Sequence, residues 1–129
     1  MARSDSFLID TQIFIWAMEE NKKLPLKIRS ILQDPETEIF LSVASVWEIV
    51  IKQAKGKLMT PKNIEESVRQ TGFNILPIEI SHALEIDKLP SHKDHNDPFD
   101  RMLIAQAKAE NLNLITTDQK IKKYDILTT

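Results

Sequence analysis

The sequence predicts an α/β domain in which helices cover both faces of a mostly parallel sheet. Short apolar runs alternate with longer segments that carry apolar residues at helical spacing, which is the pattern of repeated strand–helix units. The chain has 129 residues, enough to bury one core of ordinary size. It contains only two glycines and no glycine- or serine-rich linker, so we expect one domain over residues 1–129.

Apolar runs predict the strands, and the segments between them predict the helices. Strands are expected at 6–10, 37–42, 73–78 and 112–117, with a candidate edge strand at 125–129. Helices are expected at 11–21, 25–34, 43–58, 60–72, 80–89, 98–111 and 118–124. Pro25 suits a first helical turn, and Gly56 and Gly72 suit helix ends. Thr60 before Pro61 marks a further helix start.

The composition excludes several classes of function. The chain has no cysteine, which rules out disulfides, zinc–thiolate sites and cysteine nucleophiles. Its 42% hydrophobic residues, 28% charged residues and net charge of −2 are typical of a soluble globular protein and allow a basic groove only locally. The sequence has no glycine-rich nucleotide-binding loop. The N-terminal apolar run is too short for a signal peptide and no run has membrane-spanning length, so a cytoplasmic location is expected.

Two aspartates directly follow runs that predict strands. Asp10 ends the run 6–10, and Asp118 follows the run 112–117. The carboxyl ends of parallel strands meet at one edge of a sheet, where folds of this class bind ligands. We therefore expect the two carboxylates to lie close together at this edge.

Two further acids stand on apolar helix faces. Asp100 shares a face with Leu103, Ile104 and Ala107, which follow it at helical spacing. Glu48 lies in the opening turns of its helix and is followed by three β-branched apolar residues. Because an isolated ionised carboxylate is costly to bury, a cation or several hydrogen-bond donors should meet each one.

Helix capping is the alternative explanation, and it is the stronger one for each acid taken alone. Asp97 before Pro98 is a strong helix start, and the segment from Ser45 to Glu48 matches a capping box. The strand-end aspartates can each cap the following helix. Four caps would, however, share one edge only by coincidence, and clustered carboxylates repel one another unless a cation binds. Mg²⁺ and Mn²⁺ prefer such oxygen ligands and can activate water for hydrolysis of a phosphate ester.

Four segments resemble, in order, the signature segments of PIN-domain ribonucleases. They are LIDTQIFIWAM at 8–18, LSVASVWEIVIKQAKGKL at 41–58, HNDPFDRMLIAQA at 95–107 and LITTDQKI at 114–121. The similarity is greatest to the VapC-type toxins of type II toxin–antitoxin systems and spans Phe7 to about Tyr124. It implies a single PIN-like domain, a three-layer α/β/α sandwich around a central, mostly parallel twisted sheet.

The resemblance also implies a metal site and an activity. Four acids match the family's catalytic and metal-binding quartet, and two residues match its supporting groups: Asp10, Glu48, Asp100 and Asp118, with Thr116 and Asp97 beside them. The implied activity is that of an endoribonuclease in which carboxylate-held Mg²⁺ or Mn²⁺ activates a water that attacks an RNA phosphodiester. The products would carry a 5′-phosphate and a 3′-hydroxyl. This chain departs from the family at position 12, where relatives often have histidine and this sequence has Gln12. Glutamine can form hydrogen bonds but cannot titrate near neutral pH as histidine does.

Basic residues near these acids are candidates for guiding the RNA backbone by charge. They are Lys52, Lys55, Lys57, Arg101, Lys120, Lys122 and Lys123. A solvated surface is the ordinary role of such charge runs, and Arg101 can instead pair with a surface acid. The histidines have no metal-ligand spacing, so none of them is expected to bind metal: His82, His92 and His95.

The implied partners are an RNA substrate, a VapB-like antitoxin whose C-terminal segment occupies the active-site groove, and a second copy of the chain in a homodimer. Phe14, Trp16 and Trp47 are candidates for a contact surface, although burial in the core is the stronger expectation for each. Two other functions stay open. One is a phosphohydrolase that forms an aspartyl-phosphate on Asp10, against which Gln12 counts, since such enzymes usually have a second acid there. The other is a non-catalytic partner-binding module.

Overall fold

The fold is built on a four-stranded parallel sheet with the order β3-β2-β1-β4. The computed structural model describes residues 5–56, 63–91 and 94–129. Each strand lies within one of the apolar runs that predicted it: β1 (Ser6–Ile9), β2 (Glu38–Ser42), β3 (Asn74–Leu76) and β4 (Asn113–Ile115). The register places Leu8 of β1 between Phe40 of β2 and Leu114 of β4.

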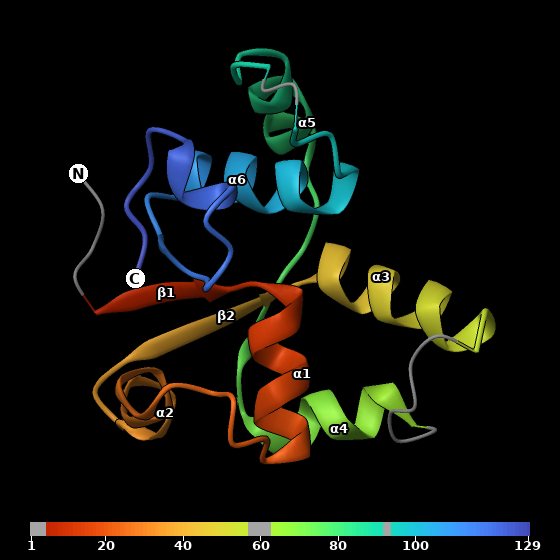
Figure 1. Ribbon diagram of the computed structural model, residues 1–129, viewed down its shortest axis with the longest axis vertical. Coiled ribbons are helices and arrows are strands. Elements are labelled where there is room, and N and C mark those ends of the chain that lie inside the picture. The colour runs from red at the N-terminus through yellow and green to blue at the C-terminus, as the bar shows by residue number, and fades with distance from the viewer. Residues whose placement is uncertain (1–4, 57–62, 92–93) are drawn as a thin grey trace.

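Helices pack on both faces of this sheet, which confirms the predicted three-layer α/β/α architecture (Figure 1). They are α1 (Thr11–Glu19), α2 (Leu26–Gln33), α3 (Val43–Ala54), α4 (Ile64–Thr71), α5 (Ile80–Asp87) and α6 (Pro98–Glu110), with a 3₁₀ turn η1 (Ile121–Lys123). In Figure 1, α5 and α6 lie above the sheet and α1, α2 and α4 below it, while α3 extends sideways from the end of β2. None of the described helices is long and apolar enough to cross a membrane.

Alternate side chains of the central strands supply two separate cores. Leu8 and Leu114 pack with Leu103 of α6 on one face of the sheet. Ile9 packs with Phe14 of α1 on the other. Because side chains alternate along a strand, a central strand covered on both faces is apolar throughout, and all of β1 is buried.

The ends of α4 follow local sequence signals. Gly72 closes the helix with a φ of +72°, a left-handed conformation that glycine adopts without a steric penalty. Asn63 caps the start, and its side-chain oxygen accepts a hydrogen bond from the backbone N of Glu66 at 3.0 Å. The start predicted at Thr60 and Pro61 lies outside the described residues.

The C-terminal tail pairs with β4 without forming a full strand. The backbone N of Leu114 donates to the carbonyl of Leu127 at 2.9 Å, and the backbone N of Thr129 donates to the carbonyl of Leu114 at 2.9 Å. The predicted edge strand is therefore reduced to one parallel bridge, and the helix predicted at 118–124 is reduced to the turn η1. Because β4 has only three residues, it offers few backbone groups with which the tail can form hydrogen bonds.

The order of the strands places a ligand crevice at β1. From β1 the chain continues to β2 on one side, and it returns to β4 on the other side. At such a reversal the connecting segments diverge and open a crevice beyond the carboxyl ends of the strands. Asp10 follows β1 and Asp118 follows its neighbour β4, so both acids lie beside this crevice.

The three aromatic candidates for a contact surface differ in exposure. Phe14 is fully buried, as expected, and Trp16 is half-buried. The core expectation is wrong for Trp47, which is 56% exposed on α3. Its ring packs edge-on against Phe99 of α6, with 5.1 Å between ring centroids, so it bridges two helices at the surface.

Candidate active site

Asp10 stands where β1 ends and α1 begins. Its backbone N donates to the carbonyl of Ile115 at 3.1 Å, which ties it to the end of β4. Its Oδ1 accepts a hydrogen bond from the backbone N of Ile13 at 2.8 Å, so Asp10 is the predicted helix cap. Asp10 is nevertheless buried, and burial raises the pKa of its carboxyl to about 6, although hydrogen bonds from Thr116 and Ile13 lower it.

Asp118 reaches the same edge from the end of β4. Its backbone N donates to Oγ1 of Thr116 at 3.0 Å, and its Oδ1 accepts from the backbone N of Lys120 at 2.9 Å. This bond closes a local turn, but Asp118 does not cap η1 as predicted, because the N-cap position of η1 is Lys120 and has no side-chain cap. Thr116 is buried and its hydroxyl bonds the Asp10 side chain as well. The Thr116 hydroxyl thus contacts both Asp10 and Asp118. Thr116 is the residue that the family resemblance gave as a supporting group for these acids.

The first turn of α6 carries Asp100 into the crevice. Asp97 caps the helix, its Oδ1 accepting from the backbone N of Asp100 at 2.9 Å, and Pro98 occupies the first turn as predicted. The Asp100 side chain takes no part in this cap, and its Oδ2 lies 3.1 Å from Nε2 of His95. Burial raises the pKa of Asp100, the hydrogen bond from His95 lowers it, and the charges of Asp97 and Glu48 raise it.

Glu48 is not part of a capping box, so that alternative is wrong. α3 begins earlier, because Ser42 caps it by accepting a hydrogen bond from the backbone N of Ala44 at 3.0 Å. Ser45 lies inside the helix, where its hydroxyl accepts from that of Thr11 at 2.9 Å. Glu48 is consequently carried on the inner face of α3, with no helix end to stabilise.

The two carboxylate oxygens of Glu48 have different surroundings. Oε2 forms an ion pair with Nζ of Lys52 at 2.9 Å. Oε1 is buried and has no hydrogen-bond partner among the residues that the structure describes. A buried carboxylate oxygen without a partner is costly, so this atom marks a position that a cation would stabilise.

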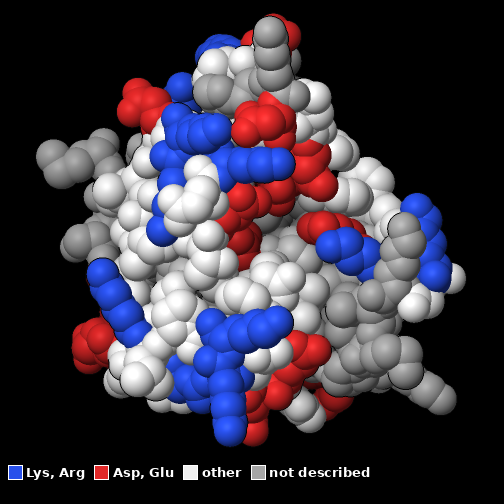
Figure 2. All heavy atoms as spheres, viewed as in Figure 1, with Lys and Arg blue, Asp and Glu red and all other residues white. Residues whose placement is uncertain are grey.

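All four predicted acids line one cavity of about 310 Å³ at the carboxyl edge of the sheet. The residues that line this acidic cavity are Asp10, Thr11, Gln12, Ile15, Glu48, Lys52, Asp97, Asp100, Thr117 and Asp118. Figure 2 shows acidic side chains inside a central hollow with basic side chains on either side of it. Besides burial, the charges of Asp100 and Asp118 raise the pKa of Asp10, so the carboxylates interact electrostatically. Carboxylate oxygens in this number fit Mg²⁺ or Mn²⁺.

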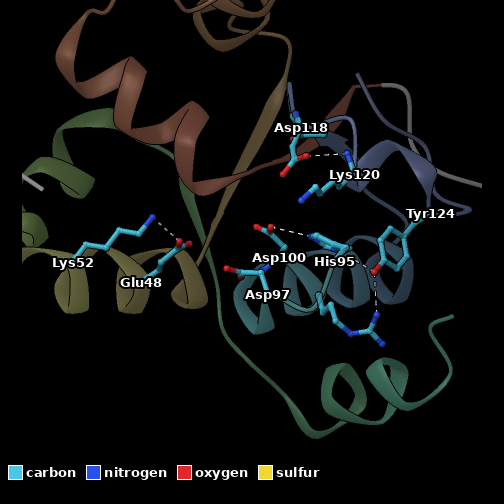
Figure 3. Close-up of polar contacts among 10 residues, drawn as sticks. Glu48, Lys52, His95, Asp97, Asp100, Asp118, Lys120 and Tyr124 are labelled. Carbon is cyan, nitrogen blue, oxygen red and sulfur yellow. Dashed lines mark hydrogen bonds and ion pairs between the residues drawn. The ribbon is translucent and has the colours of Figure 1, made fainter. Parts of the chain in front are cut away.

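His95 joins these acids, although sequence reasoning gave it no role. It is buried, and its ring lies between Asp100 and Tyr124 (Figure 3). One potential ligand atom from each of His95, Asp100 and Asp118 falls within 4.8 Å of the others. The sequence offered one signal, that His95 stands two residues before the helix cap. Its partner Tyr124 is far along the chain, and no local pattern connects the two.

The basic candidates are placed differently from one another. Lys52 lines the cavity, and in Figure 3 the Lys120 amine points toward the gap between Asp118 and Asp100. Arg101 does not line the cavity, and its Nη1 donates to the Pro90 carbonyl and to the Tyr124 hydroxyl. Among the described residues it pairs with no acid, so its alternative role as the partner of a surface acid is not seen there. The others do not line the cavity or cannot be placed: Lys55 and Lys122 are exposed, Lys123 pairs with Asp94, and Lys57 lies outside the described residues.

The fold and the cavity define a class of protein, an α/β domain that gathers carboxylates at the carboxyl edge of a parallel sheet. The PIN domain family matches residues 7–127, and the chain belongs to this family of nucleases. No curated protein shows a sequence match to the chain.

Solved structures share the fold at low sequence identity. A chain of VapBC2 from Rickettsia felis, bound to a promoter DNA fragment, aligns with a TM-score of 0.69 and 15% identity over 96% of this chain and 97% of that one. VapBC-1 from nontypeable Haemophilus influenzae aligns with a TM-score of 0.66 and 23% identity over 96% of each chain. DNA-bound VapBC from Salmonella typhimurium aligns with a TM-score of 0.66 and 16% identity over 100% of this chain and 98% of that one.

Proposed function

We propose that this protein is a divalent-metal-dependent endoribonuclease of the VapC toxin type. The observation that carries the proposal is the convergence of Asp10, Glu48, Asp100 and Asp118 on one cavity from four separate segments of the chain. Capping explains at most the local position of an acid, and it fails for Glu48. Membership of the PIN domain family supports hydrolysis of a nucleic acid.

The four carboxylates would hold the cation, and the rest of the cavity would orient the substrate. When bound, Mg²⁺ or Mn²⁺ would supply a Lewis acid that lowers the pKa of water and stabilises negative charge on the phosphodiester. Asp10 and Asp118 are fixed by backbone hydrogen bonds, so their positions are set before any ligand arrives. Lys52 and Lys120 stand beside the acids and would attract the RNA backbone.

No observation favours the aspartyl-phosphate alternative. Gln12, which lines the cavity together with Asp10, stands where such enzymes usually have a second acid. Hydrolysis in which the bond from phosphorus to the 3′-oxygen breaks as the bond to water forms would give a 5′-phosphate and a 3′-hydroxyl.

The partners of the proposed function are an antitoxin and a second copy of the chain. The likeness to VapBC complexes supports a VapB-like antitoxin, and the acidic cavity suits a basic residue from its C-terminal segment. The exposed ring of Trp47 is the best placed of the three aromatic candidates for a contact. A single domain in the cytoplasm fits this function.

The test is cleavage of labelled tRNA by purified protein with Mn²⁺ or Mg²⁺, beside reactions with EDTA and with Asp100→Asn. Asp87→Asn, which changes an exposed acid at the end of α5, is the matched control. We expect cutting that needs the cation, survives in the control and is lost in Asp100→Asn. Absence of cutting, with no rise in melting temperature on adding Mn²⁺, would overturn the proposal. Equal cutting of single-stranded DNA would overturn the RNA specificity.

A further inference from the structure

His95 uses both ring nitrogens in hydrogen bonds to protein side chains. Nδ1 lies 2.9 Å from the hydroxyl of Tyr124, and Nε2 lies 3.1 Å from Oδ2 of Asp100 (Figure 3). Both His95 and Tyr124 are 4% exposed. The imidazole thus connects a buried phenol to a carboxylate of the proposed metal site.

The direction of each hydrogen bond follows from the groups involved. Arg101 donates from Nη1 to the Tyr124 hydroxyl at 3.0 Å, and a guanidinium has no acceptor. An ionised Asp100 only accepts, so Nε2 of His95 must carry the proton between them. In a neutral imidazole with its proton on Nε2, Nδ1 is the acceptor for the Tyr124 hydroxyl. The hydrogen-bond chain Arg101–Tyr124–His95–Asp100 therefore has donors and acceptors in one consistent order.

The far end of this hydrogen-bond chain is anchored in the fold. Tyr124 belongs to the core that contains Leu103 and Leu114, and its ring meets that of His95 edge-on at 5.5 Å. Arg101 also donates to the Pro90 carbonyl at 3.0 Å. Since Tyr124 directly follows η1 and Asp118 precedes this turn, the anchor lies in the same segment as a second cavity acid.

We propose that His95 is a positioning residue, which holds the Asp100 carboxylate in the orientation that the metal site requires, with Tyr124 setting the ring of His95. This inference rests on the proposed function. His95 is not among the residues that line the acidic cavity, whereas Asp100 is. Nε2 cannot donate its proton to Asp100 and also bind a cation, and Nδ1 faces Tyr124, so His95 acts through Asp100 rather than as a ligand.

The test measures the dissociation constant of Mn²⁺ by isothermal titration calorimetry in four variants. His95→Ala should weaken Mn²⁺ binding by about 10–100-fold, the range typical of partners that orient a ligand. His95→Gln keeps an N–H donor and should restore most of the affinity. Tyr124→Phe keeps the ring in the core and should show a smaller loss. His82→Gln, a buried histidine that also faces a carboxylate but lies away from the cavity, should leave the Mn²⁺ affinity unchanged.

A second readout needs no metal. Nitrogen-15 NMR of the protein in EDTA should show His95 with its proton on Nε2, and melting curves should show that each variant is folded. Wild-type Mn²⁺ affinity in a folded His95→Ala would overturn the inference, as would a proton on Nδ1 alone. Loss in His95→Ala without rescue by glutamine, and with Tyr124→Phe unaffected, would make His95 a ligand instead. If the wild-type protein bound no Mn²⁺, the proposed function would fail and this inference with it.

Discussion

Two buried histidines of this protein each face a carboxylate, but in unlike surroundings. His82 joins α5 to α6: its Nδ1 accepts from the backbone N of Glu79 at 3.0 Å, and its Nε2 lies 2.9 Å from Oε2 of Glu110. His95 makes the corresponding contact with Asp100. Distance and burial alone do not tell the two apart.

The difference lies in the charge around each carboxylate. Glu110 is 40% exposed at the end of α6, where water screens it and His82 serves as its partner. Asp100 shares a cavity with four other carboxylates and one lysine, the acids being Asp10, Glu48, Asp97 and Asp118. The His82 contact completes a structural junction, whereas the acidic cavity keeps a surplus of negative charge. The comparison shows that unbalanced charge, rather than a histidine–carboxylate pair, indicates a binding site.

The largest expected effect is on RNA cleavage, when the same substitution is made at two different glutamates. Glu48→Gln removes a cavity carboxylate and should reduce RNA cleavage by more than about 100-fold, beyond the loss typical of a group that only orients a ligand. Glu110→Gln keeps an oxygen that can accept from His82 and should leave cleavage unchanged. Initial rates at saturating Mn²⁺ measure both. Equal losses in the two variants would remove the distinction between the sites.

The next effect is on stability. Mn²⁺ at about a hundredfold excess over its dissociation constant should raise the melting temperature of the wild-type protein by on the order of 10 °C, because the cation binds only the folded state. Glu110→Gln should show the same rise, and Glu48→Gln a much smaller one. EDTA should reverse the rise. A rise of equal size in Glu48→Gln would place the cation elsewhere.

A pH effect follows from the raised pKa of Asp10. In the metal-free folded protein this pKa is about 6, against 3.8 for an ordinary aspartate, so the folded state keeps a proton that the unfolded state has lost. The contribution of Asp10 to the free energy of unfolding therefore falls as pH rises from about 4 to 6, by roughly 3 kcal/mol at most, and is constant above.

Asp10→Asn has no such titration and keeps an oxygen that can cap α1. Its stability relative to the wild-type protein should therefore rise over this pH range and then level off. Urea denaturation of both proteins without metal measures the difference. A difference independent of pH would contradict the prediction.

The smallest effect concerns Lys52. Lys52→Gln breaks a half-exposed ion pair with Glu48 and should change the free energy of unfolding by less than about 1 kcal/mol. It should weaken RNA binding in EDTA and lower the slope of log affinity against log salt by about 1. Lys55→Gln, which changes an exposed lysine that does not line the cavity, is the matched control. Identical slopes in both variants would exclude Lys52 from the RNA path.

Most of the fold could be predicted from the sequence because its signals are local. Apolar runs located all four strands, and Asp97, Pro98 and Gly72 marked helix ends through contacts within a turn. The order of strands and helices then placed Asp10 and Asp118 at one edge, since parallel strands present their carboxyl ends together. The quartet of acids followed from these positions and from the resemblance to a family.

What only the tertiary structure decided involves segments far apart in the chain. The capping box predicted at Glu48 is wrong because Ser42 caps α3. Trp47 is exposed because it lies on the outer face of α3, whose Ala44 and Ile49 are buried in the two cores. His95 meets Tyr124, 29 residues later, only because α6 and the C-terminal turn pack together. A local sequence pattern cannot predict a contact between residues so far apart in the chain. The sequence by itself therefore determined the strands of the sheet, the α-helices that pack on it and the positions of the acids along the chain. Packing reduced the predicted C-terminal strand and helix, and it determined which groups contact the acids.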